Sequence, residues 1–319
     1  MAILITGVAG FIGSNLAKER LMQGEVVFGI DNFCRGSEKN ILAFKSNINF
    51  TFEKVEMTNL KEYEAAISVF FQTETISELW HFAANSDIPA GIESSDIDLT
   101  NTFLTTYNSL LIMKKFKIKN LYFASTSAIY GDLGQQVLFE EIGPLFPISN
   151  YGAMKLASEA IISAAAEQYL SSAYIFRFPN VIGIPATHGV ILDFIKKLKA
   201  NPTELNVLGD GSQQKAYLHV EDLIDAMLFI KENVKQKLNY FNIGANDDGI
   251  SVKVIAEQVV NSFDSKAKII YGKGRKGWIG DVPQFKYSIQ KLSSLGWSPK
   301  LNSKNAVLKA IDQIIKQET

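Results

Sequence analysis

A tyrosine and a lysine four residues apart could act together in proton transfer. Tyr151 and Lys155 lie in SNYGAMKLASEAII, a segment with a helical pattern and a candidate N-cap at Ser149. A spacing of four places both side chains on one helical face, about 6 Å apart along the axis. Tyrosine is a poor base at neutral pH because its reference pKa is about 10, but a nearby ammonium group favours the phenolate. The pair is therefore a candidate general base.

Hydroxyl side chains end the apolar run that precedes this helix. The segment NLYFAS has the pattern of a buried strand, and Thr126 and Ser127 follow at its end. In doubly wound α/β sheets the carboxyl ends of the strands face the ligand crevice. Either hydroxyl could therefore hydrogen-bond the substrate oxygen that Tyr151 deprotonates.

Three glycines stand where the first predicted strand meets the first predicted helix. Gly7, Gly10 and Gly13 form GxxGxxG after AILIT. Glycine allows a tight turn and a close approach to a pyrophosphate, and the helix N-terminus supplies N–H groups. Asp31 ends the second apolar run, where a carboxylate accepts hydrogen bonds from ribose hydroxyls and repels a 2′-phosphate. This favours NAD over NADP, with Arg35 leaving a 2′-phosphate partner as the alternative.

The surrounding pattern predicts an α/β fold with a Rossmann-type, doubly wound parallel sheet. Apolar runs at AILIT, VVFGID, ELWHFAA and NLYFAS alternate with helical patterns around 60–71 and 102–116. After AYIFRFPNVIG, prolines and turn residues predict a smaller mixed α/β substrate lobe. We expect an NAD-binding domain over residues 1–178, with a return segment near 217–243, and a nucleotide-sugar-binding domain over 179–319.

The composition excludes several classes of protein. Lys and Arg number 32 against 33 Asp and Glu, so the net charge of −1 lacks the basic excess that binding to nucleic acid requires. No apolar run approaches the ~20 residues that cross a membrane. The single cysteine, Cys34, and an N-terminus without a signal-peptide pattern predict a cytoplasmic protein. Three histidines far apart in sequence predict no metal site.

Several motifs, in order and spacing, resemble the extended short-chain dehydrogenase/reductase family, in particular its NAD-dependent nucleotide-sugar epimerases and dehydratases. They are TGVAGFIGSNLA, DNFCRGS, HFAANS, ASTSAIYG, YGAMK, RFPNVIG and GDGSQQKAYLHVEDL, and the similarity runs from residue 2 to about Trp297. The resemblance implies that Tyr151 is the base and acid, Lys155 its electrostatic partner and a ligand of the nicotinamide ribose, and Thr126 the hydroxyl that orients the substrate.

The resemblance also implies contacts with NAD and with a nucleotide-diphospho-sugar. The expected NAD contacts are Gly7, Gly10, Phe11, Ile12, Gly13, Asp31, Asn32, Arg35, Glu56, Met57, Phe82, Ala83, Ala84, Ser86, Asn101, Tyr151, Lys155 and Pro179. The expected substrate contacts are Ser127, Asn180, His188, Lys215 and Arg275. Glu56 stands where the family has aspartate, and Lys215 where many members have a phosphate-binding arginine.

The residues after Thr126 separate the possible reactions. Ser127 and Ala128 follow it, whereas the resemblance implies that a 4,6-dehydratase carries carboxyl groups there. We therefore expect a nucleotide-diphospho-sugar 4-epimerase that works through a transient 4-keto intermediate with tightly bound NAD. A 4-dehydrogenase, a 4,6-dehydratase that uses Glu140 or Glu141, and a nonenzymatic NAD-binding regulator remain as alternatives.

Two predicted helices have more apolar positions than one buried stripe needs. They span about 102–116 and 152–169, and small or apolar residues of the second are Ala153, Leu156, Ala160, Ile161, Ala164 and Ala165. A second buried face predicts contact with a partner subunit. The family resemblance likewise implies a homodimer.

Overall fold

The computed structural model describes residues 1–134, 136–263, 266–274 and 286–319, which group into two compact units. The first unit comprises Met1–Ile129, Phe146–Arg177 and Ile230–Phe241, and the second comprises Tyr130–Leu145, Phe178–Phe229 and Asn242–Thr319. The chain thus divides after Arg177, and the segment that returns to the first unit is Ile230–Phe241. Residues 130–145, which we expected in the first domain, group with the second unit.

Strands and helices alternate as far as residue 178. In chain order the elements are β1 (Ala2–Thr6), α1 (Phe11–Met22), β2 (Val26–Asp31), η1 (Glu38–Asn40), β3 (Phe50–Lys54), α2 (Leu60–Phe70), β4 (Ile76–His81), α3 (Ile88–Glu93), α4 (Ser95–Asp98), the π-helical η2 (Leu99–Leu104), α5 (Thr105–Phe116), β5 (Asn120–Thr126), η3 (Ser127–Tyr130), β6 (Val137–Leu138), α6 (Asn150–Gln168) and β7 (Ser172–Phe178).

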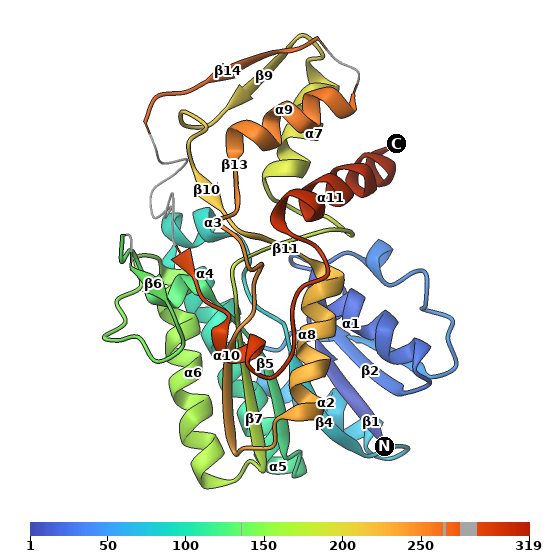
Figure 1. The fold of residues 1–319 in the computed structure, drawn as a ribbon. Coiled ribbons are helices and arrows are strands. Elements are labelled where there is room, and N and C mark those ends of the chain that lie inside the picture. Colours follow the sequence, from blue (N-terminus) through green and yellow to red (C-terminus); the bar gives the residue numbers. More distant parts are fainter. Residues whose placement is uncertain (135, 264–265, 275–285) are drawn as a thin grey trace. The chain divides into compact units, whose positions relative to one another are not determined.

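The first unit is built on a seven-stranded sheet with the order β12-β7-β5-β4-β1-β2-β3, where β12 is Leu238–Asn242. β1 pairs in parallel with both β2 and β4, and β2 with β3 and β4 with β5 are also parallel (Figure 1). The doubly wound parallel sheet predicted from the sequence is confirmed. Because the strand order reverses at β1, the loops after β1 and β4 flank the position where such sheets bind ligands.

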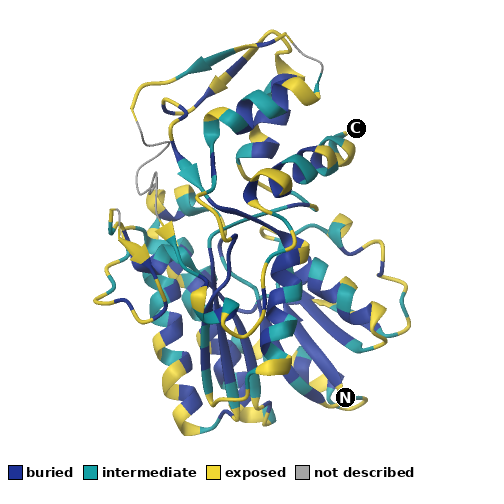
Figure 2. Ribbon diagram, in the orientation of Figure 1, coloured by how far each residue is buried: buried dark blue, intermediate teal, exposed yellow. Residues whose placement is uncertain are grey.

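Side chains that alternate along the strands build a core on each face of the sheet. Leu4, Leu79 and Leu121 belong to a cluster with buried residues of α2, α5 and α6. The neighbouring Trp80 and Tyr122 stack with ring centroids 4.1 Å apart on the opposite face. These strands are almost wholly buried (Figure 2). Burial on both faces explains why the sequence reads as continuous apolar runs.

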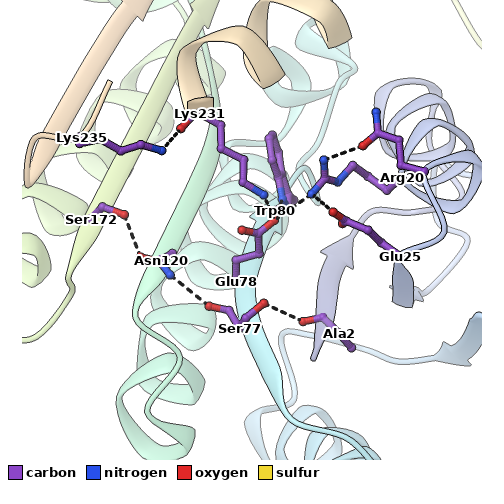
Figure 3. Close-up of polar contacts among 11 residues, drawn as sticks. Ala2, Arg20, Glu25, Ser77, Glu78, Trp80, Asn120, Ser172, Lys231 and Lys235 are labelled. Atoms are coloured by element: carbon purple, nitrogen blue, oxygen red, sulfur yellow. Dashed lines mark hydrogen bonds and ion pairs between the residues drawn. The ribbon is translucent and has the colours of Figure 1, made fainter. Parts of the chain in front are cut away.

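A buried ion network lies near the amino end of β4 (Figure 3). Glu78 accepts hydrogen bonds from Trp80 Nε1 at 2.9 Å and from Lys231 Nζ at 2.7 Å. A guanidinium nitrogen of Arg20 lies 3.8 Å from the same carboxylate and 2.6 Å from Glu25. Side-chain bonds of Ser77, Asn120 and Ser172 extend a polar row across the neighbouring strands. The network fixes β4 against α1 and against Lys231 of α8 (Val220–Asn233).

The second unit is a smaller mixed α/β assembly. Its further elements are β8 (Asn180–Ile182), α7 (Val190–Ala200), β9 (Glu204–Val207), β10 (Gln214–Lys215), β11 (Tyr217–His219), the first part of α8, β13 (Ile250–Ser251), α9 (Val252–Ser262), β14 (Lys268–Tyr271), β15 (Lys286–Tyr287), α10 (Gln290–Ser293) and α11 (Ser303–Glu318). Its core joins α7, α9 and α11, where Ile195, Val259 and Ile311 are fully buried.

Residues 130–145 are tied to the second unit by backbone and side-chain bonds. β6 pairs in parallel with β15, and the backbone N–H of Asn242 donates to Glu140 Oε1 at 2.9 Å. These long-range contacts leave no local signal in the sequence. Within the described segments, none of the helices has both the length and the apolar character that a membrane span needs.

Candidate active site

The turn between β1 and α1 contains positions at which any residue larger than glycine would clash with the backbone. Gly7 has a φ of +69°, and a Cβ on it would lie 2.7 Å from the backbone nitrogen of Ala83. A Cβ on Gly13 would lie 2.2 Å from the carbonyl oxygen of Gly7. Gly10, the N-cap residue of α1, has no side chain to occupy the first-turn N–H groups. The turn is thus a cradle that suits a pyrophosphate.

Asp31 anchors the glycine turn from the end of β2. The carboxylate is 7% exposed, and it accepts from the backbone N–H of Ala9 at 3.0 Å and of Phe33 at 2.8 Å. Burial raises the pKa of Asp31, and these backbone bonds oppose the rise. A carboxylate has about four lone-pair sites, and a third backbone bond, from Asn32, leaves acceptor capacity for a ribose hydroxyl.

Polar bonds also organise the loop beyond Asp31. Asn32 Nδ2 donates to Glu56 Oε2 at 2.8 Å, which ties β2 to the turn after β3. Met57, the next residue, is buried. Arg35 pairs with Asp87 at 3.0 Å, so its guanidinium has a carboxylate partner within the protein. That pairing weakens the case for Arg35 as a partner of a 2′-phosphate.

The residues after β4 lie beside the glycine turn. The backbone N–H of Phe82 donates to the carbonyl of Thr6 at 3.2 Å, and Ala83 N lies 3.4 Å from Thr6 Oγ1. Ala84 is partly exposed and Ser86 is exposed. Asn101 lies in the π-helical η2 and is partly buried.

Helix α6 brings Tyr151 and Lys155 together with Thr126. The predicted N-cap is confirmed, because Ser149 Oγ accepts from Gly152 N at 3.1 Å. Lys155 Nζ lies 5.9 Å from the centre of the Tyr151 ring. Burial and the charge of Asp98 raise the pKa of Tyr151, while a hydrogen bond with Thr126 opposes the rise. The protein by itself therefore holds Tyr151 protonated at neutral pH.

Lys155 is a buried lysine of this site. Its side chain is 2% exposed, and Nζ donates to the carbonyl of Ala124 at 2.6 Å. Nζ also lies 4.6 Å from the centre of the Phe123 ring. Burial lowers the pKa of Lys155 to about 7, although Glu159 and Asp98 act in the opposite direction. The ammonium is thus poised to lose its proton near neutral pH.

Two buried carboxylates beside Lys155 were absent from our sequence prediction. Glu159 accepts two bonds from Arg177 Nε, at 3.0 and 3.2 Å, and one from its terminal nitrogen at 2.6 Å. The signal was present, because Glu159 follows Lys155 at the same four-residue spacing and Arg177 interrupts an apolar run. Asp98 lies among polar residues, in SSDIDLTNT, and carried no comparable signal.

The predicted substrate contacts of the second unit lie on separate elements. Asn180, which follows Pro179, begins β8 and donates through Nδ2 to the carbonyl of Ala216 at 3.3 Å. Lys215 is in β10, paired with Ile250 of β13. His188 is exposed in the loop before α7. Arg275 lies outside the described residues.

The sheet, the glycine turn, the acid after β2 and the Tyr151–Lys155 pair together define a dinucleotide-dependent protein of the short-chain dehydrogenase/reductase type. The model of the NAD dependent epimerase/dehydratase family matches residues 3–244, and the chain belongs to this family. NAD is its cofactor. The cradle at Gly7 and the buried acid Asp31 fit that dinucleotide.

The chain is similar over its whole length to several named proteins. It is 30% identical to a UDP-glucose 4-epimerase of Lacticaseibacillus casei, covering 99% of this chain and 95% of the relative. The NAD complex of a Thermus thermophilus UDP-glucose 4-epimerase has a TM-score of 0.85 at 26% identity, covering 99% of both chains. A dTDP-glucose 4,6-dehydratase of Bacillus anthracis has a TM-score of 0.83 at 25% identity, covering 100% of this chain and 97% of its own.

Proposed function

We propose that the chain is a nucleotide-diphospho-sugar 4-epimerase that works through a transient 4-keto sugar. One observation carries the choice: Tyr151, Lys155 and Thr126 converge at the end of β5, and the two residues directly after Thr126, Ser127 and Ala128, carry no carboxylate. The three side chains can remove a proton from a sugar hydroxyl. Without an adjacent acid, the keto sugar has no local route to lose water.

Each of the three residues has a distinct task in this proposal. Tyr151 takes the proton of the sugar 4-hydroxyl and later returns it. Thr126, hydrogen-bonded to Tyr151, orients the same oxygen. Lys155 stabilises the phenolate by its positive charge and binds the nicotinamide ribose. Bound NAD supplies an acceptor that takes the C4 hydride and gives it back.

We assign the NAD contacts to residues of the first unit, together with Pro179 of the second. The turn Gly7–Gly13, including Phe11 and Ile12, holds the pyrophosphate. Asp31, Asn32, Arg35, Glu56 and Met57 lie at the adenosine end, and Phe82, Ala83, Ala84, Ser86 and Asn101 at the nicotinamide end. The buried acid of β2 and the Arg35–Asp87 pair support NAD rather than NADP.

The second unit is assigned to the nucleotide sugar. Asn180, His188, Lys215 and Arg275 would contact its diphosphate or sugar, together with Ser127 of the first unit. Lys215 supplies charge without the bidentate fork of arginine. The UDP-sugar names of the relatives support this substrate class.

A dehydratase is the alternative that a specific relative favours, since a 4,6-dehydratase shares the fold. It needs an acid that the strand end lacks, and Glu140 and Glu141 are the candidates. Glu140 is 5% exposed and accepts from the backbone of Asn242 at 2.9 Å. Glu141 pairs with Lys291 at 3.3 Å. These bonds oppose recruitment of either carboxylate to a sugar.

The products of a substrate panel in deuterium oxide test the proposal. UDP-, GDP-, CDP- and dTDP-hexoses are incubated with the NAD-loaded protein and followed by NMR. A 4-epimer without deuterium at C5 is expected. A 6-deoxy-4-keto sugar would assign a dehydratase, and a 4-keto sugar with stoichiometric NADH a dehydrogenase. Intact NAD binding without any turnover would favour the regulator.

We also propose that the protein is a homodimer through η2, α5 and α6. Leu99 and Tyr107 expose 49% and 46% of their surface on the first two elements. Ala160 and Ala164 are exposed on α6. Small and apolar residues that the subunit leaves uncovered suit a helix-to-helix contact with a second copy.

A further inference from the structure

Asp98 carries a buried carboxylate to which no role has been assigned. The residue ends α4 and is 0% exposed. Its Oδ1 accepts from Asn85 Nδ2 at 2.8 Å, whereas Oδ2 has no hydrogen-bond partner among the described residues. Gly91 makes room for Oδ2, since a Cβ there would lie 1.8 Å from it. A buried carboxylate oxygen without a donor costs stability, so packing alone does not account for it.

The segment around Asp98 packs directly on the helix that carries Tyr151 and Lys155. α3, α4 and η2 all contact α6, and Asn150 Nδ2 of α6 donates to the carbonyl of Gly91 at 2.8 Å. The π-helical turn η2 begins at the residue after Asp98. Such turns are rare and occur frequently at functional sites.

The carboxylate acts on both proton-carrying side chains of α6. Burial lowers the pKa of Lys155, and Asp98 opposes that change. Burial raises the pKa of Tyr151, and Asp98 adds to that rise. In return, burial raises the pKa of Asp98 itself, while bonds from Asn85 and Thr102 and the charge of Lys155 oppose it. The charges and protonation states of Asp98, Tyr151 and Lys155 therefore influence one another.

The neighbouring carboxylates are already paired. The negative charge of Glu159 raises the pKa of Lys155, as that of Asp98 does, but Arg177 binds both oxygens of Glu159, so this carboxylate has a cation of its own. Arg35 likewise pairs with Asp87 near Asp98.

His81 of β4 is buried, and burial and the charge of Lys155 lower its pKa to about 3, so it is neutral. Within the described part of the chain, Asp98 is thus the negative charge near Lys155 that lacks a cation of its own.

We propose that Asp98 is a positioning residue of the site: its buried carboxylate, which no other described cation pairs, is a counter-charge that helps to keep the buried Lys155 an ammonium ion. Lys155 then meets the cofactor and Tyr151 as a cation. The catalytic consequence rests on the proposed function, whereas the protonation of Lys155 does not. Asp98→Asn keeps the shape and removes the charge, and Asp96→Asn, on the exposed side of the same helix, is the matched control.

The first test measures the free energy of unfolding in urea from pH 6 to 9, on the full chain freed of nucleotide. In the wild type it rises with pH once folded Lys155 loses its proton. With Asp98→Asn, the rise should begin about one pH unit lower, the shift expected when one nearby charge is lost. Asp96→Asn should follow the wild type. A loss that is the same at every pH would overturn the proposal, because it would show a merely structural role.

A second measurement decides the question if Asp98→Asn does not fold. In wild-type protein labelled with [4-¹³C]aspartate, one carboxyl resonance should shift as Lys155 titrates, and Lys155→Met should abolish that shift. Absence of such a resonance would refute the proposal.

With substrate, the rate of the first hydride transfer is measured as a function of pH. The fall of this rate at high pH should begin about one pH unit lower in Asp98→Asn. If the wild type turns over no sugar, the proposed function fails, while the unfolding data still judge Asp98.

Discussion

Lys155→Met should change how the stability of the nucleotide-free protein depends on pH. Folded Lys155 has a pKa of about 7, against 10.5 for an ordinary lysine, because burial removes water from its ammonium group. Between these values the unfolded chain holds a proton that the folded chain has released. The free energy of unfolding must therefore rise with pH across this window, and the lysine is a cost to stability that is greatest below pH 7.

The magnitude follows from the two pKa values. Each unit of pKa difference corresponds to about 1.4 kcal/mol, so a lysine titrating at 7 when folded gains about 2 kcal/mol between pH 7 and pH 9. Methionine fills a similar volume and does not titrate. The difference in unfolding free energy between wild type and Lys155→Met should therefore change by about 2 kcal/mol over that interval, in favour of the wild type at pH 9.

Urea unfolding followed by tryptophan fluorescence at several pH values measures this difference. Tyr63 is buried with a raised pKa, but it is common to both proteins and cancels. Parallel curves for the two proteins would refute the reasoning, since they would show that folded Lys155 keeps its proton up to pH 9.

Four further predictions follow from the same structure. Tyr151→Phe should lower turnover by about 10²–10⁴ and leave NAD binding intact, and near-normal turnover would remove Tyr151 from the mechanism. Calorimetry should show NAD binding much more tightly than NADP, because the buried Asp31 repels a 2′-phosphate, and equal affinities would contradict this. Glu78→Gln should lower the free energy of unfolding by about 3–5 kcal/mol, since it leaves Lys231 and Arg20 without their shared counter-charge. The control is the partly exposed Glu64, which pairs with Lys115, and Glu64→Gln should cost about 1 kcal/mol or less. Light scattering should give twice the 35.4 kDa chain mass, and Tyr107→Lys should reduce it to one chain; a wild-type monomer at micromolar concentration would exclude the dimer.

The buried strands could be predicted almost residue by residue, but the edge strand could not. β1 and β2 coincide with the apolar runs AILIT and VVFGID, because strands covered on both faces need apolar side chains throughout. β3, with the sequence FTFEK, lies at the edge of the sheet, and three of its five residues are polar or charged. Such a strand has no continuous apolar pattern, and the sequence analysis did not identify it.

The sequence by itself determined the residues that local geometry constrains. The glycine turn, the acid after β2 and the four-residue spacing of Tyr151 and Lys155 all act over short stretches of chain, so their types and spacing are readable in one dimension. The predicted helix over 102–116 begins instead with a π-helical turn, η2, which a hydrophobic pattern of helical period does not distinguish from an α-helix.

Only the tertiary structure decided the electrostatics of the site. Asp98 reaches Lys155 from a helix more than fifty residues earlier, and Arg177 of strand β7 reaches Glu159 of helix α6. Residues 130–145 likewise join the second unit through pairing with β15. Burial and the effect of distant charges depend on which segments come into contact in the folded chain. These contacts join residues that are far apart in sequence, so the sequence alone does not reveal them.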